Sequence, residues 1–324
     1  MVLANVHGIP APIGEPQPRL PDRGFHVVVL GPDNRPRYFC KCRPLNGHTL
    51  HRETRIMSGL GRKPDLATVI PATFGVMAGK IQIQVSDFVP GTRMSVLFRR
   101  LSQRACIDTL RDLVLLAERL SGAASAVLTE LPEPSAEIEI RTEVERLLLQ
   151  LAPLIGDGRV RAIERAVRDL PDRVPWVWQH GDFWPANILR HGTGYTILDF
   201  EQYGLVGVPL YDLFHLVSTC SNLRDTWQRA KHLAWFDRFS EPGTFTYACR
   251  EVLASAIRRA RLAPGEVAAG LLYYTLHMAA SIRGRGAPPA FWQSYVHDAI
   301  TLAASVGDKG PVELVTPMLT SRAA

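Results

Sequence analysis

The sequence changes its hydrophobic period near residue 91, and this change constrains the fold more than any other feature. Before that point the apolar residues form continuous or alternating runs, typical of strands, over 25–30, 37–42, 73–77 and 81–85. After it they recur with a period of 3.6, which predicts helices over 107–128, 137–154, 160–170, 223–239, 246–261, 265–283 and 289–306. A β-rich segment followed by a helical one is typical of an α+β protein. We therefore expect two lobes, a small β-rich N-terminal lobe and a larger helical C-terminal lobe.

Turn signals and shifts in composition divide the chain into three parts. Residues 1–24 are rich in proline and predict an irregular arm. Residues 25–90 form the expected N-terminal lobe, in which a turn cluster at 31–34 predicts an antiparallel hairpin and 49–60 predicts a helix. Residues 91–324 form the expected C-terminal lobe, with a sharp change of direction at Pro90-Gly91 marking the boundary.

Composition argues against several classes of protein. The hydrophobic fraction of 46% and the charged fraction of 21% are those of an ordinary globular protein. No signal-peptide pattern opens the chain, and the longest uncharged apolar stretch, 267–282, falls short of the roughly 20 residues of a membrane span and predicts a buried helix. The five cysteines show neither a CxxC pair nor zinc-ligand spacing. The net charge of +6 is not concentrated in a Lys/Arg block. We expect a cytoplasmic protein that binds neither membrane nor nucleic acid.

One non-helical stretch, 174–213, interrupts the helical part. It contains two short apolar runs, 187–189 and 195–198, separated by a His-Gly-Thr-Gly turn, and this predicts a small hairpin. Beside the hairpin stand His180-Gly181-Asp182, Asn187 and Asp199, which supply two carboxylates and one carboxamide. Phosphoryl transfer needs such a set, because one group orients the attacking hydroxyl and hard oxygen ligands hold magnesium.

The order His-x-Asp-x4-Asn, followed after a hairpin by Asp199-Phe200-Glu201, resembles the signature of the aminoglycoside phosphotransferase and choline kinase superfamily. The resemblance implies a bilobal protein-kinase-like fold and transfer of phosphate from ATP to a hydroxyl group of a small molecule. It also implies that Asp182 is the catalytic aspartate and that Asn187 and Asp199 bind Mg²⁺. By the same resemblance His180 braces the catalytic loop and Asp212 ties that loop together.

The N-terminal lobe offers the partners that a nucleotide-binding lobe of this kind requires. Lys41 lies on the predicted second strand, where alternation places it on the face opposite Cys40 and Cys42. The resemblance implies that Lys41 contacts the α- and β-phosphates, that Glu53 in the following helix is its ion-pair partner, and that Ser86, Asp87 and Phe88 form the adenine-binding hinge. The sequence has no Gly-rich phosphate loop ahead of Phe25, where only Gly24 is placed to help.

Several alternatives remain at this point. Asp182, Asn187 and Asp199 could each be turn formers, Lys41 could be a solvated edge lysine, and Glu53 could pair with a neighbouring arginine. A catalytically silent kinase-like scaffold is the main alternative function. A protein kinase is disfavoured, because Gly181 replaces the Arg of the His-Arg-Asp motif and no Ala-Pro-Glu segment follows. An atypical nucleotidyl transferase that uses the same fold remains an alternative.

The acceptor is constrained only by charge. Acidic and basic residues are nearly balanced from Glu201 to the end, with no acidic cluster. A neutral or anionic acceptor, such as a sugar, a sugar derivative or a metabolite alcohol, therefore fits at least as well as a polycationic aminoglycoside. The expected acceptors are thus a sugar, an amino-sugar or a metabolite alcohol. We make no prediction of the oligomeric state.

Overall fold

The computed structural model describes residues 3–6, 25–44, 49–78, 81–124, 136–225, 244–286 and 289–319. The chain packs as two compact units. The first comprises residues 1–94, 123–131 and 186–203, and the second comprises residues 95–122, 132–185 and 204–324. The predicted α+β class is confirmed, with a β-rich N-terminal region and a helical C-terminal region. Residues 186–203, which include Asn187 and Asp199, pack with the N-terminal unit.

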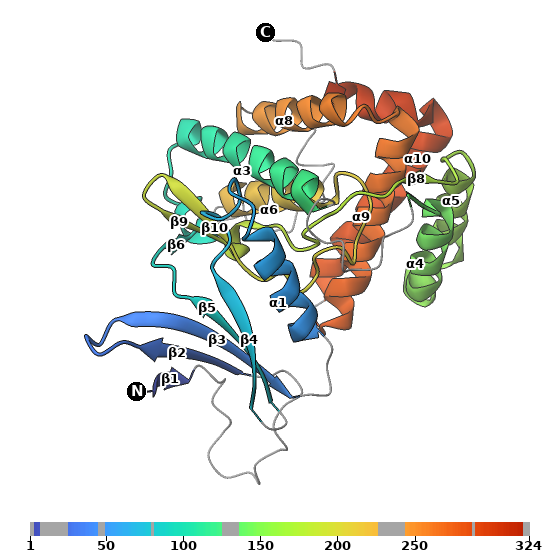
Figure 1. The fold of residues 1–324 in the computed structure, drawn as a ribbon. Helices are drawn as coiled ribbons and strands as arrows, with labels where there is room; N and C mark the ends of the chain where they lie inside the picture. Colours follow the sequence, from blue (N-terminus) through green and yellow to red (C-terminus); the bar gives the residue numbers. More distant parts are fainter. Residues whose placement is uncertain are drawn as a thin grey trace. The chain divides into compact units, whose positions relative to one another are not determined.

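A five-stranded sheet dominates the first unit, in the order β1-β2-β3-β5-β4, and all its pairs are antiparallel (Figure 1). The predicted hairpin is confirmed as β2 (Phe25–Leu30) and β3 (Pro36–Pro44), joined by a turn in which Asn34 adopts φ 61°. Strands β4 (Thr73–Ala78) and β5 (Ile81–Asp87) complete the predicted set. In this register Lys41 lies opposite His26 on β2 and Gln84 on β5.

Helix α1 (Thr49–Leu60) covers the sheet and has the predicted bounds. Its apolar side chains Ile56 and Leu60 are fully buried, which anchors the helix against the strands. Glu53 is 2% exposed, so a carboxylate is held inside the unit next to this apolar stripe. A buried charge of this kind requires a partner.

The described part of the N-terminal arm, residues 3–6, departs from the prediction. Residues 1–24 were expected to be irregular, but Leu3–Val6 forms strand β1, which pairs with β2. The first strand of the sheet therefore comes from the start of the chain, and not from the residues that immediately precede Phe25 in the sequence. Gly24, the glycine considered for phosphate binding, lies outside the described residues.

A second, three-stranded sheet carries the predicted hairpin of the non-helical stretch. It is made of β9 (Ile188–His191) and β10 (Gly194–Ile197), which pair as predicted across a two-residue turn, together with the short strand β6 (Thr92–Arg93). A 3₁₀ turn (Pro185–Asn187) precedes β9. The backbone N–H of Ile197 donates to the carbonyl of Val69, so the hairpin is bonded to the segment between α1 and β4.

The second unit is helical. Its elements are α3 (Gln103–Ala124), α4 (Ile140–Ile155), α5 (Asp157–Arg168), α6 (Tyr211–Asp225), α8 (Thr244–Ala260), α9 (Pro264–Gly284) and α10 (Pro289–Leu319), with α2 (Met94–Leu97) before them and β7 (Glu137–Ile138) paired with β8 (Val174–Pro175). Helix α9 packs against α4, α6 and α10 and is buried along most of its length, as expected for 267–282. No helix in the described parts of the chain has the length and apolarity of a membrane span.

Several helix boundaries differ from the prediction. The main correction is α6, which begins at Tyr211 inside the stretch predicted to be non-helical, whereas the helix was expected over 223–239. Residues 226–239 lie outside the described part of the chain. Helix α3 starts at Gln103 rather than 107, α4 starts at Ile140 because Glu137–Ile138 pairs as a strand, and α10 continues to Leu319. Terminal positions are the least predictable part of a helix.

Candidate active site

A buried ion pair between Lys41 and Glu53 forms the centre of the site in the first unit. The Nζ atom of Lys41 lies 2.9 Å from Oε2 of Glu53, and the two side chains are 9% and 2% exposed. The other carboxylate oxygen of Glu53, Oε1, accepts from the backbone N–H of Phe200 at 3.1 Å. The predicted ion pair between Lys41 and Glu53 is therefore confirmed. Glu53 also binds the backbone of the segment that follows β10.

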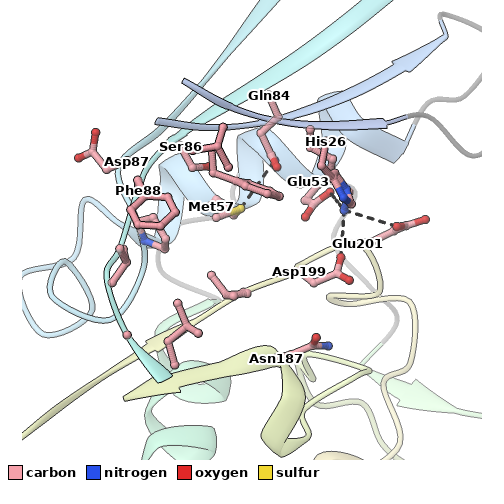
Figure 2. A pocket seen from close by; sticks show the side chains of 18 of the residues that line it. His26, Glu53, Met57, Gln84, Ser86, Asp87, Phe88, Asn187, Asp199 and Glu201 are labelled. Atoms are coloured by element: carbon pink, nitrogen blue, oxygen red, sulfur yellow. Dashed lines mark hydrogen bonds and ion pairs between the residues drawn. The ribbon is translucent and has the colours of Figure 1, made fainter. Parts of the chain in front are cut away.

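Lys41 shares its charge among three carboxylates. Its Nζ donates to Oδ1 of Asp199 at 3.0 Å and lies 3.6 Å from Oε2 of Glu201. Figure 2 shows Glu53, Asp199 and Glu201 directed toward the same point. Asp199 adopts φ 60°, a left-handed conformation that aspartate tolerates better than most residues and that is frequent at functional sites.

The protonation of this cluster follows from burial and from its charges. Burial acts to lower the pKa of Lys41, but the adjacent carboxylates of Glu53 and Asp199 outweigh it, so the pKa lies above its ordinary value and the ammonium is charged at neutral pH. Burial also raises the pKa of Glu53, and Lys41 opposes this rise only in part. Burial is the largest cause of the rise, and the negative charges of Asp199 and Glu201 add to it.

Arg43 was not singled out by the sequence analysis, although it lies two residues after Lys41 on the same face of β3. Its guanidinium makes two hydrogen bonds to the carboxylate of Glu201, at 3.0 and 2.6 Å. Glu201 likewise follows Asp199 by two residues. The i, i+2 spacing on a strand is the signal that could have identified Arg43.

Lys41, Arg43, Glu53, Asp199 and Glu201 line a cavity of about 590 Å³ that lies within the first unit. The three predicted hinge residues and Asn187 also line it, so the structure brings all the predicted nucleotide- and metal-binding positions of this unit to one cavity: Lys41, Glu53, Ser86, Asp87, Phe88, Asn187 and Asp199. In Figure 2 the side chain of Asp87 points away from the carboxylate cluster. A cavity of this size matches a nucleotide-sized ligand.

The second unit holds the loop that carries Asp182. Asp212, at the start of α6, is buried and accepts from the backbone N–H groups of His180 at 2.5 Å and of Gly181 at 2.8 Å. The backbone N–H of Asp212 in turn donates to Oε1 of Gln179 at 2.9 Å. Gly181 has φ 81°, which explains a glycine here. The predicted link from Asp212 to the loop is thus present.

Burial and hydrogen bonding oppose each other at this loop. Burial raises the pKa of Asp212, while the His180 side chain and the two backbone donors act in the opposite direction without cancelling it. His180 is fully buried, and its Nδ1 accepts from the backbone N–H of Asp182 at 3.4 Å. This contact links the His180 ring to the backbone of the loop, and a bracing role for His180 stays a prediction.

The sequence analysis did not assign His215 to the site, but the structure places it beside Asp182. The Nε2 atom of His215 lies 3.4 Å from Oδ1 of Asp182, and the two side chains are 6% and 30% exposed. His180, Asp182, Asp212 and His215 therefore belong together in the second unit. Asp182 belongs to the second unit, and Asn187, five residues later in the chain, belongs to the first.

Comparisons with known proteins give the fold a context. The fold is similar to APH(2″)-IIIa with bound GDP and kanamycin (TM-score 0.53, 13% identity, 94% of this chain and 93% of that chain covered). It is also similar to a thermostable mutant of the aminoglycoside phosphotransferase APH(4)-Ia with ADP and hygromycin B (0.53, 12%, 99% and 96%) and to choline kinase from Cryptosporidium parvum (0.52, 11%, 92% and 90%). At these identities the likeness shows a shared kinase-like fold. No curated protein matches the sequence.

A family comparison of the sequence goes further than the fold. The sequence model of the phosphotransferase enzyme family matches residues 15–251, which is well over half of the chain. The matched range contains the Lys41–Glu53 pair, Asp182, Asn187 and Asp199. The chain belongs to the phosphotransferase enzyme family.

Proposed function

We propose that this protein transfers the γ-phosphate of ATP to a hydroxyl group of a small molecule, with the assistance of Mg²⁺. The observation that carries the proposal is the cavity of the first unit, in which a charged, oriented Lys41 is combined with Asn187 and Asp199. A cation for phosphates and oxygen ligands for magnesium are the two things that phosphoryl transfer requires of such a lobe.

Lys41 is suited to hold the phosphates because its ammonium is fixed before the nucleotide arrives. Glu53 and Asp199 hold Nζ at 2.9 and 3.0 Å, and burial keeps water from competing. A preorganised charge in such a site stabilises developing negative charge without reorganisation. Ser86, Asp87 and Phe88, which line the same cavity, are the proposed contacts of the adenine ring.

The residues of the cavity fit a magnesium ion. Asp199 provides a carboxylate whose side chain is 44% exposed, and Asn187 provides a carboxamide oxygen. Mg²⁺ is commonly held by one or two such groups together with substrate phosphates. Bound there, the ion would neutralise charge on the phosphates.

Asp182 is the proposed catalytic residue. It accepts a hydrogen bond from the acceptor hydroxyl, which orients the oxygen toward the γ-phosphorus. The bond from the acceptor oxygen to phosphorus forms as the bond to the β-phosphate oxygen breaks, and the hydroxyl proton passes to the Asp182 carboxylate. Because phosphoryl-transfer transition states are loose, Asp182 contributes mainly by positioning.

The nucleotide site is tested by titration calorimetry with ATP and with GTP, each with and without magnesium. GTP is included because one structural relative binds GDP and another binds ADP. We expect magnesium-dependent binding by the wild type that is lost in Asp199→Ala. An Asp199→Ala protein that binds and transfers normally would contradict the metal assignment, and a wild type that binds neither nucleotide would favour the silent-scaffold alternative.

The transfer step is tested separately by screening hydroxylated metabolites for phosphate uptake. Asp182→Ala should lower kcat by several orders of magnitude while magnesium-dependent nucleotide binding remains, since Asp182 belongs to the other unit. Product carrying AMP instead of phosphate would replace the kinase assignment with a nucleotidyl transferase.

A further inference from the structure

We propose that His215 is a positioning residue for the catalytic carboxylate, and that its Nε2–H donates to Oδ1 of Asp182 so that Asp182 presents its exposed part to the acceptor hydroxyl. The proposal rests on the function proposed for Asp182. It adds a residue that neither the sequence motif nor the family match points to.

His215 lies on α6, one helical turn after Asp212. The two polar residues stand three positions apart, and both are buried. Residues three apart lie on one face of a helix, one turn above another. Asp212 holds the backbone of the loop at His180 and Gly181, and His215, one turn later, reaches the side chain of Asp182.

The two partners differ in how far they are exposed to solvent. The His215 side chain is 6% exposed, whereas the Asp182 side chain is 30% exposed, and His215 Nε2 lies 3.4 Å from Asp182 Oδ1. A buried imidazole thus contacts one oxygen of a carboxylate that is still accessible to solvent. Contacts of this kind are commonly long before substrate binds and shorten afterwards.

The contact with Asp182 also bears on which nitrogen of His215 carries the proton. An ionised carboxylate can only accept hydrogen bonds, so the contact with Asp182 requires the proton on Nε2. Nδ1 of a neutral ring is then an acceptor, and the hydroxyl of Tyr274 lies 3.5 Å from it. The titratable groups that face His215 among the described residues are Asp182 on the loop, Asp212 on α6, and Tyr274 and His277 on α9.

In the reaction, His215 keeps its proton throughout. The proton of the acceptor hydroxyl passes to Asp182 as the new oxygen–phosphorus bond forms, and the hydrogen bond from His215 restricts rotation of the Asp182 carboxylate. Restricting the reacting geometry lowers the barrier without changing substrate binding. The expected effect of losing His215 is therefore on kcat and not on the KM for the nucleotide.

The kinetic experiment compares His215→Met, which fills the space without a donor, with His215→Gln, whose amide can still donate. Release of phosphate from MgATP with water as acceptor serves as the assay, and the same Met substitution at the exposed His297 is the control. A lost hydrogen bond to a charged group corresponds to a fall in kcat of roughly 10- to 100-fold for His215→Met. His215→Gln should lose at least about fivefold less, since its donor remains. An equal fall in kcat in His215→Met and His215→Gln, or a change in the KM for the nucleotide with no change in kcat, would overturn the proposal.

A second measurement does not depend on activity. Nitrogen-15 NMR of the histidine side chains reports which ring nitrogen is protonated. We expect the Nε2–H form at His215 in the wild type and a changed Nε2 shift in Asp182→Asn. An Nδ1–H form, or a His215 Nε2 shift that is the same in the wild type and in Asp182→Asn, refutes the proposal even if the protein is an active kinase. The expected NMR result in a protein that hydrolyses no ATP would instead support the contact and count against the proposed function.

Discussion

Replacing Glu53 tests how the charge of Lys41 is held. The carboxylate of Glu53 serves two donors, because Oε2 accepts from Lys41 Nζ at 2.9 Å and Oε1 accepts from the backbone N–H of Phe200 at 3.1 Å. It therefore ties α1 both to β3 and to the segment after β10. Glu53→Ala removes both acceptors, whereas Glu53→Gln removes the charge but keeps a carbonyl oxygen for Phe200.

The expected losses of stability follow from these two contacts. Removing one partner of a buried ion pair costs about 3–5 kcal/mol. The lower end applies here, because Lys41 keeps Asp199 at 3.0 Å, so the loss of charge should cost about 3 kcal/mol in either variant. A buried amide that loses its acceptor costs a further ~1–3 kcal/mol, in Glu53→Ala alone. We expect Glu53→Gln to lose about 3 kcal/mol and Glu53→Ala to lose about 5 kcal/mol.

The assay is urea unfolding at pH 7 followed by far-UV circular dichroism, with hydrogen exchange of the Phe200 amide as a local probe. Tryptophan fluorescence is unsuitable, since all six tryptophans belong to the second unit. The exposed Glu145→Gln is the control and should stay within about 0.5 kcal/mol of the wild type. A Glu53→Gln protein as stable as the wild type, or equal losses in the Gln and Ala variants, would refute the reasoning.

Three further predictions concern the second unit. Asp212→Asn leaves one oxygen for the two backbone donors of the loop, so we expect a loss of about 3 kcal/mol in urea unfolding and a fall in kcat, and a fully active variant would contradict this. Burial lowers the pKa of His277 to about 4, so the unfolded chain binds a proton below pH 6.5 that the folded chain does not. Stability should therefore fall by about 3 kcal/mol from pH 6.5 to 4, and His277→Gln should flatten this slope. Gly207→Ala places a Cβ 2.0 Å from Nε1 of Trp176, so we expect a loss of ~1–3 kcal/mol and a shifted tryptophan emission, and unchanged emission would show that the site relaxes.

The N-terminal lobe is predictable because its signals are local. The hairpin of β2 and β3 follows from two β-rich runs around a turn, and α1 has the bounds that its sequence pattern predicts. Alternation along β3 placed Lys41 on the face opposite Cys40 and Cys42, and both cysteines are buried in the structure. The Lys41–Glu53 pair joins two of these locally predicted elements, which is why resemblance and pattern together identify it.

Pairings between distant segments are not predictable in this way. Strand β1 pairs with β2 across residues 7–24, and β6 at 92–93 pairs with β9 at 189–190. Neither short strand carries an apolar alternation long enough to be recognised. Their positions depend on partners that the local sequence does not specify.

Helix α6 shows why hydrophobic periodicity does not identify a helix that is buried on all sides. Almost every described residue of α6 is buried or nearly so, and apolar residues therefore appear on all its faces and give no amphipathic pattern. What can be recognised instead are its buried polar residues, Asp212, His215, Ser218 and Ser221. Because each buried polar group needs a partner, such residues in a buried helix predict polar partners on the segments packed against it. Asp212 and His215 contact the loop of Asp182, whereas Ser218 bonds to Tyr274 and Ser221 lies beside Cys249. Buried polar residues one helical turn apart, as at Asp212 and His215, are therefore the sequence signal that leads to His215.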